Sequence, residues 1–250
     1  MGVLDEANDG RALHASVGGV VYTRHPVRTH LVTAADDALA VLTRYLGQPP
    51  DGTRLVAVSE RMIAITQGRS YPISEIKASR LARLLERFVT RPGYGIGLGS
   101  AETMELAIRE VGLPRILLAA AASAVTKPFG IHGVFYRVAG PQAKAIDGPT
   151  SYTIPPYNQS ATLGPKNPDD AARRLAAGIG VPVAVIDAND AGCAVLGASP
   201  GVDRRFVERL FADNPLGQAG EQTPVCLVQE VSWPAGQELP AEPKRRLTPP

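Results

Sequence analysis

The sequence is poor in cysteine, in aromatic residues and in net charge. Its 250 residues include two cysteines and one tryptophan, and aromatic residues make up only 5%. Two cysteines cannot form the disulfide framework of a small secreted domain, so this usage is typical of a reducing compartment. Lysine and arginine together number 26 against 24 acidic residues. The resulting net charge of +2 is too small to indicate a nucleic-acid partner.

Long hydrophobic runs are also missing. The most apolar stretch, residues 116–125, is about half as long as the roughly 20 residues that span a bilayer. The first ten residues are acidic and polar, and they do not have the basic and apolar regions of an export signal. We therefore expect a cytoplasmic protein that has no membrane partner.

What the sequence does contain is a globular composition, with 44% hydrophobic and 20% charged residues. Its length allows one large domain or two small, intertwined ones. Residues 1–16 have no periodicity and predict a flexible leader, and residues 237–250 contain four prolines and predict a disordered tail. Residues 17–236 between them show neither a repeat nor a linker, which predicts a single domain.

Apolar spacing and capping signals predict five helices. They lie between a capping box at Thr33–Asp36 and Gly47, through Leu81–Phe88 up to Pro92, between Ser100 and Gly112, over 116–124, and from Asn167 to Gly178. Short β-rich runs predict strands at 19–23, 55–58, 62–65, 133–138, 181–186 and 225–229. Because these elements alternate without a regular βαβ order, we expect an α+β or irregular mixed α/β fold.

Acidic residues follow one of the predicted strands. Asp187 and Asp190 come directly after the apolar run 181–186, and Asp147 lies on another predicted turn. Ligand sites often form at the carboxyl ends of strands, and carboxylates this close can share a hard divalent cation. The alternative is that these residues simply form Asx turns.

A glycine-rich segment and one arginine are candidates for binding an anion. Residues 93–99 alternate glycine with other residues and open a helix at Ser100, where free backbone N–H groups could hold a phosphate or a carboxylate. Arg69 follows Gly68 in a predicted turn and could pair with the same kind of group. The alternatives are a flexible connector and a surface arginine. Cys193 is a further candidate, as a nucleophile or as a small buried filler.

Three segments resemble the coenzyme F420-0:γ-glutamyl ligase family: residues 29–37, residues 51–59 with the turn 67–69, and residues 183–190. Weaker likeness runs through 145–148 and 224–228. The resemblance implies the ligase-like fold and an enzyme that adds glutamate to the deazaflavin coenzyme through a GTP-derived acyl phosphate. It also implies a homodimer.

The same resemblance implies roles for individual residues. Asp147 and Asp187 match catalytic aspartates that bind Mn²⁺ or Mg²⁺ beside GTP, with Asp190 as a supporting ligand. We expect the phosphates of GTP, or of ATP, to be held by Arg69 and by the backbone of four residues, Gly95, Gly97, Gly99 and Ser100. The substrates would be a small-molecule acid acceptor, which need not be the deazaflavin, and an amino acid, glutamate by resemblance.

The sequence also departs from the family pattern. Ile65 stands where the family has a lysine, Gln67 stands for a glutamate, and an Asp-Leu-x-Gly-Arg segment after Gly197 has no counterpart. Because phosphoryl transfer needs several preorganised cations, we expect little glutamylation of the deazaflavin itself. These losses leave a second hypothesis open, namely a non-catalytic relative that binds a small anionic ligand or a protein partner.

Overall fold

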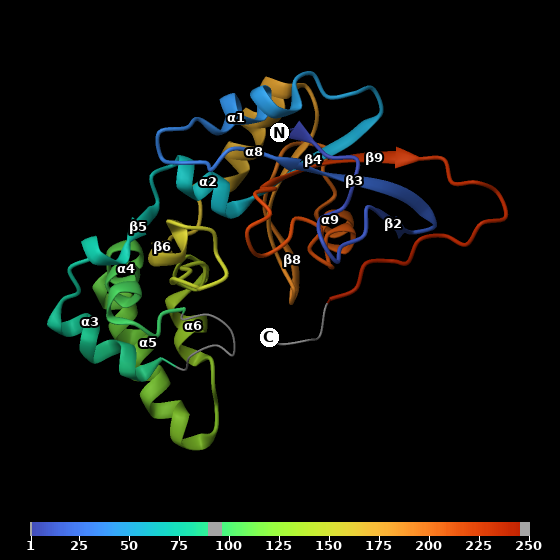
Figure 1. The fold of residues 1–250 in the computed structure, drawn as a ribbon. Helices are drawn as coiled ribbons and strands as arrows, with labels where there is room; N and C mark the ends of the chain where they lie inside the picture. The colour runs from blue at the N-terminus through green and yellow to red at the C-terminus, as the bar shows by residue number, and fades with distance from the viewer. Residues whose placement is uncertain (1, 90–96, 246–250) are drawn as a thin grey trace. The chain divides into compact units, whose positions relative to one another are not determined.

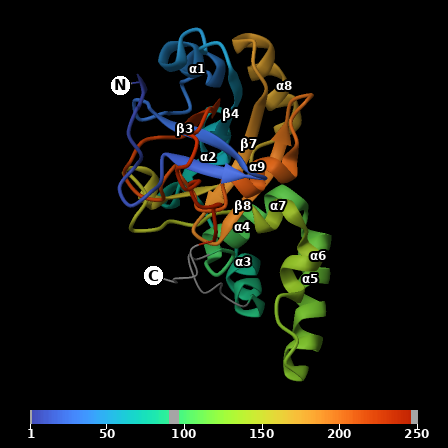
Figure 2. The same ribbon diagram turned by 90° about the vertical axis from the view of Figure 1, so that its right-hand side faces the viewer.

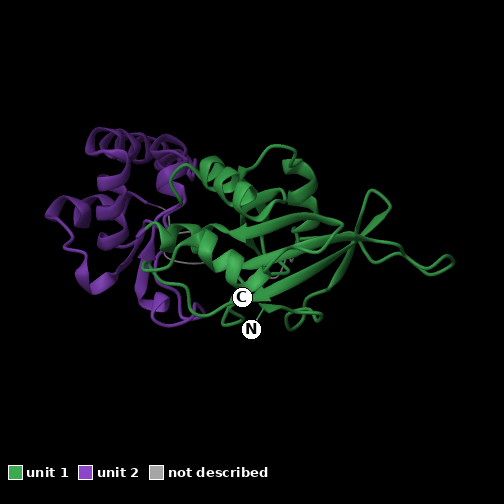
Figure 3. Cartoon of the chain, turned by 90° about the horizontal axis from the view of Figure 1, so that it is seen from above, with its two compact units in different colours: residues 1–67, 165–248 green, residues 68–164, 249–250 purple. Residues whose placement is uncertain are grey.

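The computed structural model describes residues 2–89 and 97–245, and the chain divides into two compact units (Figure 3). Unit 1 takes its described residues from 2–67 and 165–245, and unit 2 from 68–89 and 97–164. Unit 2 is therefore inserted into unit 1, where the sequence predicted one domain. Helices account for 37% of the residues and strands for 21%, which confirms a mixed α and β class.

Unit 1 is built on a seven-stranded sheet with the order β1-β3-β9-β4-β7-β8, and β2 also pairs with β3. Its strands are β1 (Gly2–Val3), β2 (His14–Val17), β3 (Val20–Arg28), β4 (Thr53–Ser59), β7 (Val183–Asn189), β8 (Gly192–Ala198) and β9 (Val225–Val231). The pair β4–β7 is parallel, and the other pairs are antiparallel. Its helices are α1 (Ala38–Leu46), α2 (Glu60–Thr66), α8 (Pro168–Ile179) and α9 (Arg204–Leu210).

The central strands are apolar because both faces of the sheet are covered. α8 packs on β7 and β8 beside α1, whereas α9 lies on the other side of the sheet (Figure 1). Alternation along each strand sends successive side chains to opposite faces. One core cluster therefore takes its strand residues in alternation, Leu55 and Ala57, Ala184 and Ile186, and Cys226 and Val228, and packs them against α9. In the sequence, strands that are buried on both faces are continuous hydrophobic runs.

A glycine allows the closest approach of α8 to the sheet. A Cβ atom at Gly197 would lie 2.2 Å from the backbone carbonyl carbon of Pro168, so no larger residue fits there without a backbone shift. α8 begins at Pro168 after Asn167, as predicted, and its acidic first turn contains Asp169. The Asp169 carboxylate accepts a hydrogen bond from the Ala198 N–H at 2.8 Å, which fixes the helix start on β8.

Unit 2 is mainly helical. It contains α3 (Arg80–Leu85), α4 (Ala101–Val111), α5 (Leu113–Thr126), α6 (Val134–Ala139) and α7 (Pro141–Lys144), with the strand pair β5 (Ser70–Pro72) and β6 (Ser160–Thr162). Short 3₁₀ helices lie at η1 (Ile73–Glu75), η2 (Glu86–Phe88), η3 (Lys127–Phe129) and η4 (Tyr157–Gln159). α5 runs beside α6 (Figure 2). Met104, Ile116, Phe135 and Ile146 are fully buried and form the centre of its core.

Two predicted strands are helices in the structure. The run Met62–Ile65 is the buried part of α2, because four consecutive apolar residues do not distinguish a strand from a buried helix. The segment 133–138 falls on α6, where Phe135 and Ala139 are buried one helical turn apart. Packing of these two residues outweighs the β propensity of the neighbouring valine and aromatic side chains.

The described residues at both chain ends contact the sheet of unit 1. The expected flexible leader pairs with β3 through β1 and β2, and Ala15 is 1% exposed. In the expected disordered tail, residues 237–245 are described and none of them is buried. The Ser16 hydroxyl donates to the Pro240 carbonyl oxygen at 2.6 Å, so the tail runs along β2. Across the described residues, no helix has the length and apolar character needed to cross a membrane.

Candidate functional site

Asp187 lies at the carboxyl end of the parallel pair β4–β7. Ser59, the last residue of β4, stands opposite Ile186, so Asp187 is the next residue beyond this register. The carboxyl ends of parallel strands meet at one edge of a sheet, where ligands commonly bind. Asp187 is half-buried, and its Oδ1 atom accepts a hydrogen bond from the Asn189 amide at 3.2 Å.

Asp190 is held by an ion pair that no sequence pattern indicated. The predicted turn 187–190 is shorter in the structure, because β7 continues to Asn189 and the hairpin turns at 190–191 before β8. The Asp190 carboxylate accepts from Arg11 Nη1 at 2.9 Å, and its backbone N–H donates to Gln218 Oε1 at 3.2 Å. A metal at Asp190 would have to compete with this guanidinium.

Asp147 belongs to unit 2, whereas Asp187 belongs to unit 1. Asp147 is exposed and forms an isolated antiparallel bridge with Thr162, with both backbone hydrogen bonds at 2.9 Å. The preceding residue, Ile146, is fully buried. That Asp147 and Asp187 share a metal remains a prediction from the resemblance.

The carboxylates do not form a metal site by themselves. Within residues 2–89 and 97–245, no group of three or more His, Cys, Asp or Glu side chains is arranged to hold a metal ion. In the β7–β8 hairpin, Asp190 faces Arg11 and the Asn189 amide nitrogen donates to Asp187. Mg²⁺ and Mn²⁺ favour about six oxygen ligands, so the hairpin alone does not fit such an ion.

Arg69 is buried and internally bonded. It is 6% exposed, so the alternative of a surface arginine is wrong. Its Nε atom donates to the Gly164 carbonyl oxygen and its Nη2 atom to Glu110 Oε1, both at 2.7 Å. These bonds join the two ends of the chain segment that forms unit 2, at Gly68 and Gly164, to α4. We assign Arg69 this structural role, and its binding of phosphate remains a prediction.

The glycine segment is described only from Gly97 onward, and Gly95 lies outside the described residues. Gly97 has a φ angle of +50°, in the left-handed region that favours glycine. Ser100 caps α4 as predicted: its hydroxyl accepts from the Thr103 N–H at 3.2 Å, and its own N–H donates to Thr103 Oγ1 at 3.4 Å. Gly99 is buried. This reciprocal capping box occupies the Ser100 N–H, one of the groups that the phosphate hypothesis required.

Cys193 does not have the environment of a nucleophile. It lies on β8, and burial together with the carboxylates of Asp187 and Glu208 raises the pKa of its thiol. A raised pKa keeps the thiol protonated at neutral pH, which removes the reactive thiolate. The interpretation of Cys193 as a filler is the better one.

No protein-family model matches the chain, and no curated protein matches its sequence.

Proposed function

We propose that the chain is a nucleotide- and metal-dependent amide ligase that is similar to the coenzyme F420-0:γ-glutamyl ligases. One observation carries the proposal. Three of the segments that resemble the family, 51–59, 183–190 and 224–228, cover β4, β7 and the first half of β9, which are neighbours in one sheet in the order β9-β4-β7. Segments that are far apart in the sequence thus form one structural unit, with Asp187 at the edge where ligands of α/β sheets bind.

The proposed reaction has two steps. A carboxylate oxygen of the acid acceptor attacks the terminal phosphorus of GTP or ATP, and the nucleoside diphosphate leaves. The amine of an amino acid such as glutamate then attacks the acyl carbon, phosphate leaves, and an amide remains. Asp147 and Asp187 would hold Mn²⁺ or Mg²⁺, which when bound neutralises charge on phosphoryl oxygens. We place the protein in the cytoplasm as a homodimer, and light scattering tests the dimer.

A second candidate is a non-catalytic relative that binds a small anion or a protein partner. The internal bonds of Arg69 to Glu110 and of Asp190 to Arg11 favour it, because both charged groups are already neutralised within the chain. Ile65, at the position of the family's lysine, is 5% exposed in α2 and contributes to packing.

Thermal unfolding separates the two candidates. For the ligase, Mn²⁺ with GTP or ATP raises the melting temperature more than either component alone, since a ligand that binds only the folded state stabilises it. Asp187→Asn and Asp147→Asn remove this metal-dependent gain. Glu230→Gln, an exposed carboxylate on β9, serves as the matched control and retains it. If neither nucleotide adds to the effect of Mn²⁺, the ligase proposal fails and the binding function is favoured.

A direct assay tests the deazaflavin as acceptor. We incubate the protein with F420-0, glutamate, GTP and Mn²⁺ and follow the product by mass spectrometry. We expect little glutamylation, because the family's lysine and its Asp-Leu-x-Gly-Arg arginine have no counterpart here. Multiple turnovers would show that these charges are dispensable.

A further inference from the structure

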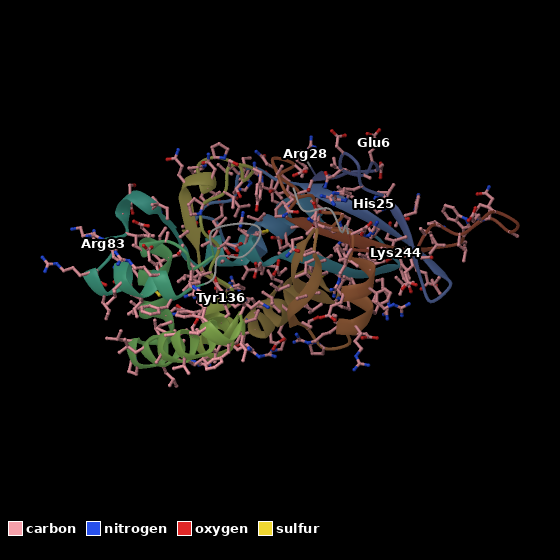
Figure 4. All side chains as sticks on the ribbon, turned by 90° about the horizontal axis from the view of Figure 1, so that it is seen from below. Glu6, His25, Arg28, Arg83, Tyr136 and Lys244 are labelled. Carbon is pink, nitrogen blue, oxygen red and sulfur yellow. The ribbon has the colours of Figure 1, made fainter. Side chains whose placement is uncertain are left out.

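Basic side chains from two distant parts of the chain line one cavity in unit 1. The cavity has a volume of about 700 Å³, within the range of small-molecule sites, roughly 300–1,000 Å³. α9 contributes Arg205 and Arg209, and the C-terminal segment contributes Lys244 and Arg245. Figure 4 labels Lys244, which lies on this segment of unit 1.

Three of these cations have no acidic partner within the described part of the chain. Arg209 is paired with Glu242, with contacts of 2.9 and 2.6 Å from its Nε and Nη2 atoms. For Arg205, Lys244 and Arg245, no ion pair to an acid is found among the described residues. Like charges gathered around one cavity repel each other, and an anionic ligand relieves that repulsion.

The backbone around the cavity is adapted to hold the tail in place. Gly192, at the start of β8, has a φ angle of +136°, and a Cβ atom there would lie only 3.0 Å from Arg245 Nε. A glycine therefore lets the Arg245 side chain lie against the hairpin. Two further interactions hold the tail. Ser16 donates a hydrogen bond to the Pro240 carbonyl oxygen, and Arg209 forms an ion pair with Glu242. The tail thus forms a fixed wall of the cavity.

We propose that α9, the start of β8 and residues 243–245 form a binding site for a small molecule that carries two or more phosphate groups. Guanidinium groups match phosphate oxygens with paired N–H donors, and Lys244 adds a point charge. Glu208, the one acid among the described lining residues, accepts from the Val195 N–H at 3.3 Å. The cavity is on the α9 face of the sheet, whereas alternation along β7 directs Asp187 to the other face. The site therefore does not include Asp187, the aspartate that unit 1 contributes to the proposed ligase site.

Calorimetric titration of the full chain with pyrophosphate, in EDTA and at low salt, tests the proposal. We expect binding that weakens as salt is raised. Arg205→Gln and the double variant Lys244→Gln, Arg245→Gln each weaken it by at least about tenfold. Arg173→Gln, an exposed arginine on α8, is the matched control and leaves the affinity unchanged. These side chains are exposed, so the variants should remain folded, which circular dichroism verifies.

Three outcomes would overturn the proposal. They are no heat with millimolar pyrophosphate, equal affinity of the cavity variants and the control, or tighter binding of citrate than of pyrophosphate. A second readout is trypsin cleavage after Lys244 and Arg245, which bound pyrophosphate slows. Because EDTA excludes divalent metals, failure here is distinguishable from failure of the Mn²⁺-dependent ligase test.

Discussion

A buried ion pair in unit 1 allows a quantitative test of how the sheet and α9 are held together. The Arg24 side chain on β3 is 0% exposed, and its two Nη atoms contact the two Asp213 carboxylate oxygens at 2.5 and 3.0 Å. The same guanidinium donates to the Leu210 carbonyl at 2.8 Å and to the Ala12 carbonyl at 2.7 Å. Arg24 thus links the N-terminal segment, β3 and the end of α9.

Asp213→Ala leaves the Arg24 guanidinium buried without its counter-charge. Removing one partner of a buried pair costs about 3–5 kcal/mol, which corresponds to a loss of roughly 6–20 °C in melting temperature for a domain of this size. Asp213→Asn keeps one acceptor oxygen, so it should cost less. The double variant Arg24→Met, Asp213→Leu should be more stable than Asp213→Ala, because it removes both charges, although the Leu210 and Ala12 carbonyls then lose a donor.

Urea unfolding measures these free energies. Trp233 is the only tryptophan and lies in unit 1, so its fluorescence follows that unit, and circular dichroism follows the whole chain. Equal m values would show that the variants differ in stability rather than in the unfolded state. A cost below about 1 kcal/mol for Asp213→Ala would contradict the reasoning, because it would place the pair in the range of exposed ion pairs.

Three further predictions concern single side chains. Ser199→Ala removes the hydroxyl that accepts from the buried Val183 N–H at 2.9 Å and should lower the unfolding free energy by about 1–3 kcal/mol; an unchanged urea midpoint would refute this. Asp37 caps α1, and the hydrogen bond that its carboxylate accepts from the Ala40 N–H lowers the pKa of Asp37 from 3.8. The contribution of this cap to stability is therefore complete above pH 3.8 and is lost as pH falls through the lower pKa of the folded state. Asp37→Asn should therefore show a weaker loss of stability between about pH 5 and pH 2 than the wild type, and parallel curves would contradict the assignment. Burial raises the pKa of Cys226 to about 12, so iodoacetamide should label it only after denaturation, and rapid labelling of the native protein would show that the strand opens.

The centre of the fold could be predicted because its signals are local. The apolar runs 55–58, 181–186 and 225–229 fall on β4, β7 and β9, and Ser100 and Asn167 open helices as expected. The capping box at Thr33–Asp36 closes a turn instead, and α1 begins after the next aspartate. Two adjacent acids offered two helix starts, and the sequence alone did not distinguish them.

The rest depends on contacts that no local pattern encodes. β8 consists mostly of small residues, so it has little of the β-branched signal that predicts a strand. α9 is only seven residues long, so it spans barely two turns. Glu110 is 41 positions from Arg69, and Arg11 is 179 positions from Asp190. Each ion pair neutralises a side chain that was predicted to bind a phosphate or a metal ion. The sequence could identify these charged residues as candidate ligand-binding residues, but it could not show which of them form ion pairs within the protein.

The β7–β8 hairpin is the element on which both proposals depend, and its alternation keeps them apart. Ala188 and Cys193 stand opposite each other and pack with the α9 cluster, whereas Asp187 is directed to the other face. Asp187 and the cations of the cavity therefore lie on different sides of one sheet. A ligand of the cation-lined cavity would contact the hairpin at Cys193, whose side chain is on the face opposite to that of Asp187. Loss of metal-dependent nucleotide binding and loss of metal-free pyrophosphate binding should accordingly follow from different substitutions, and each can be lost while the other is kept.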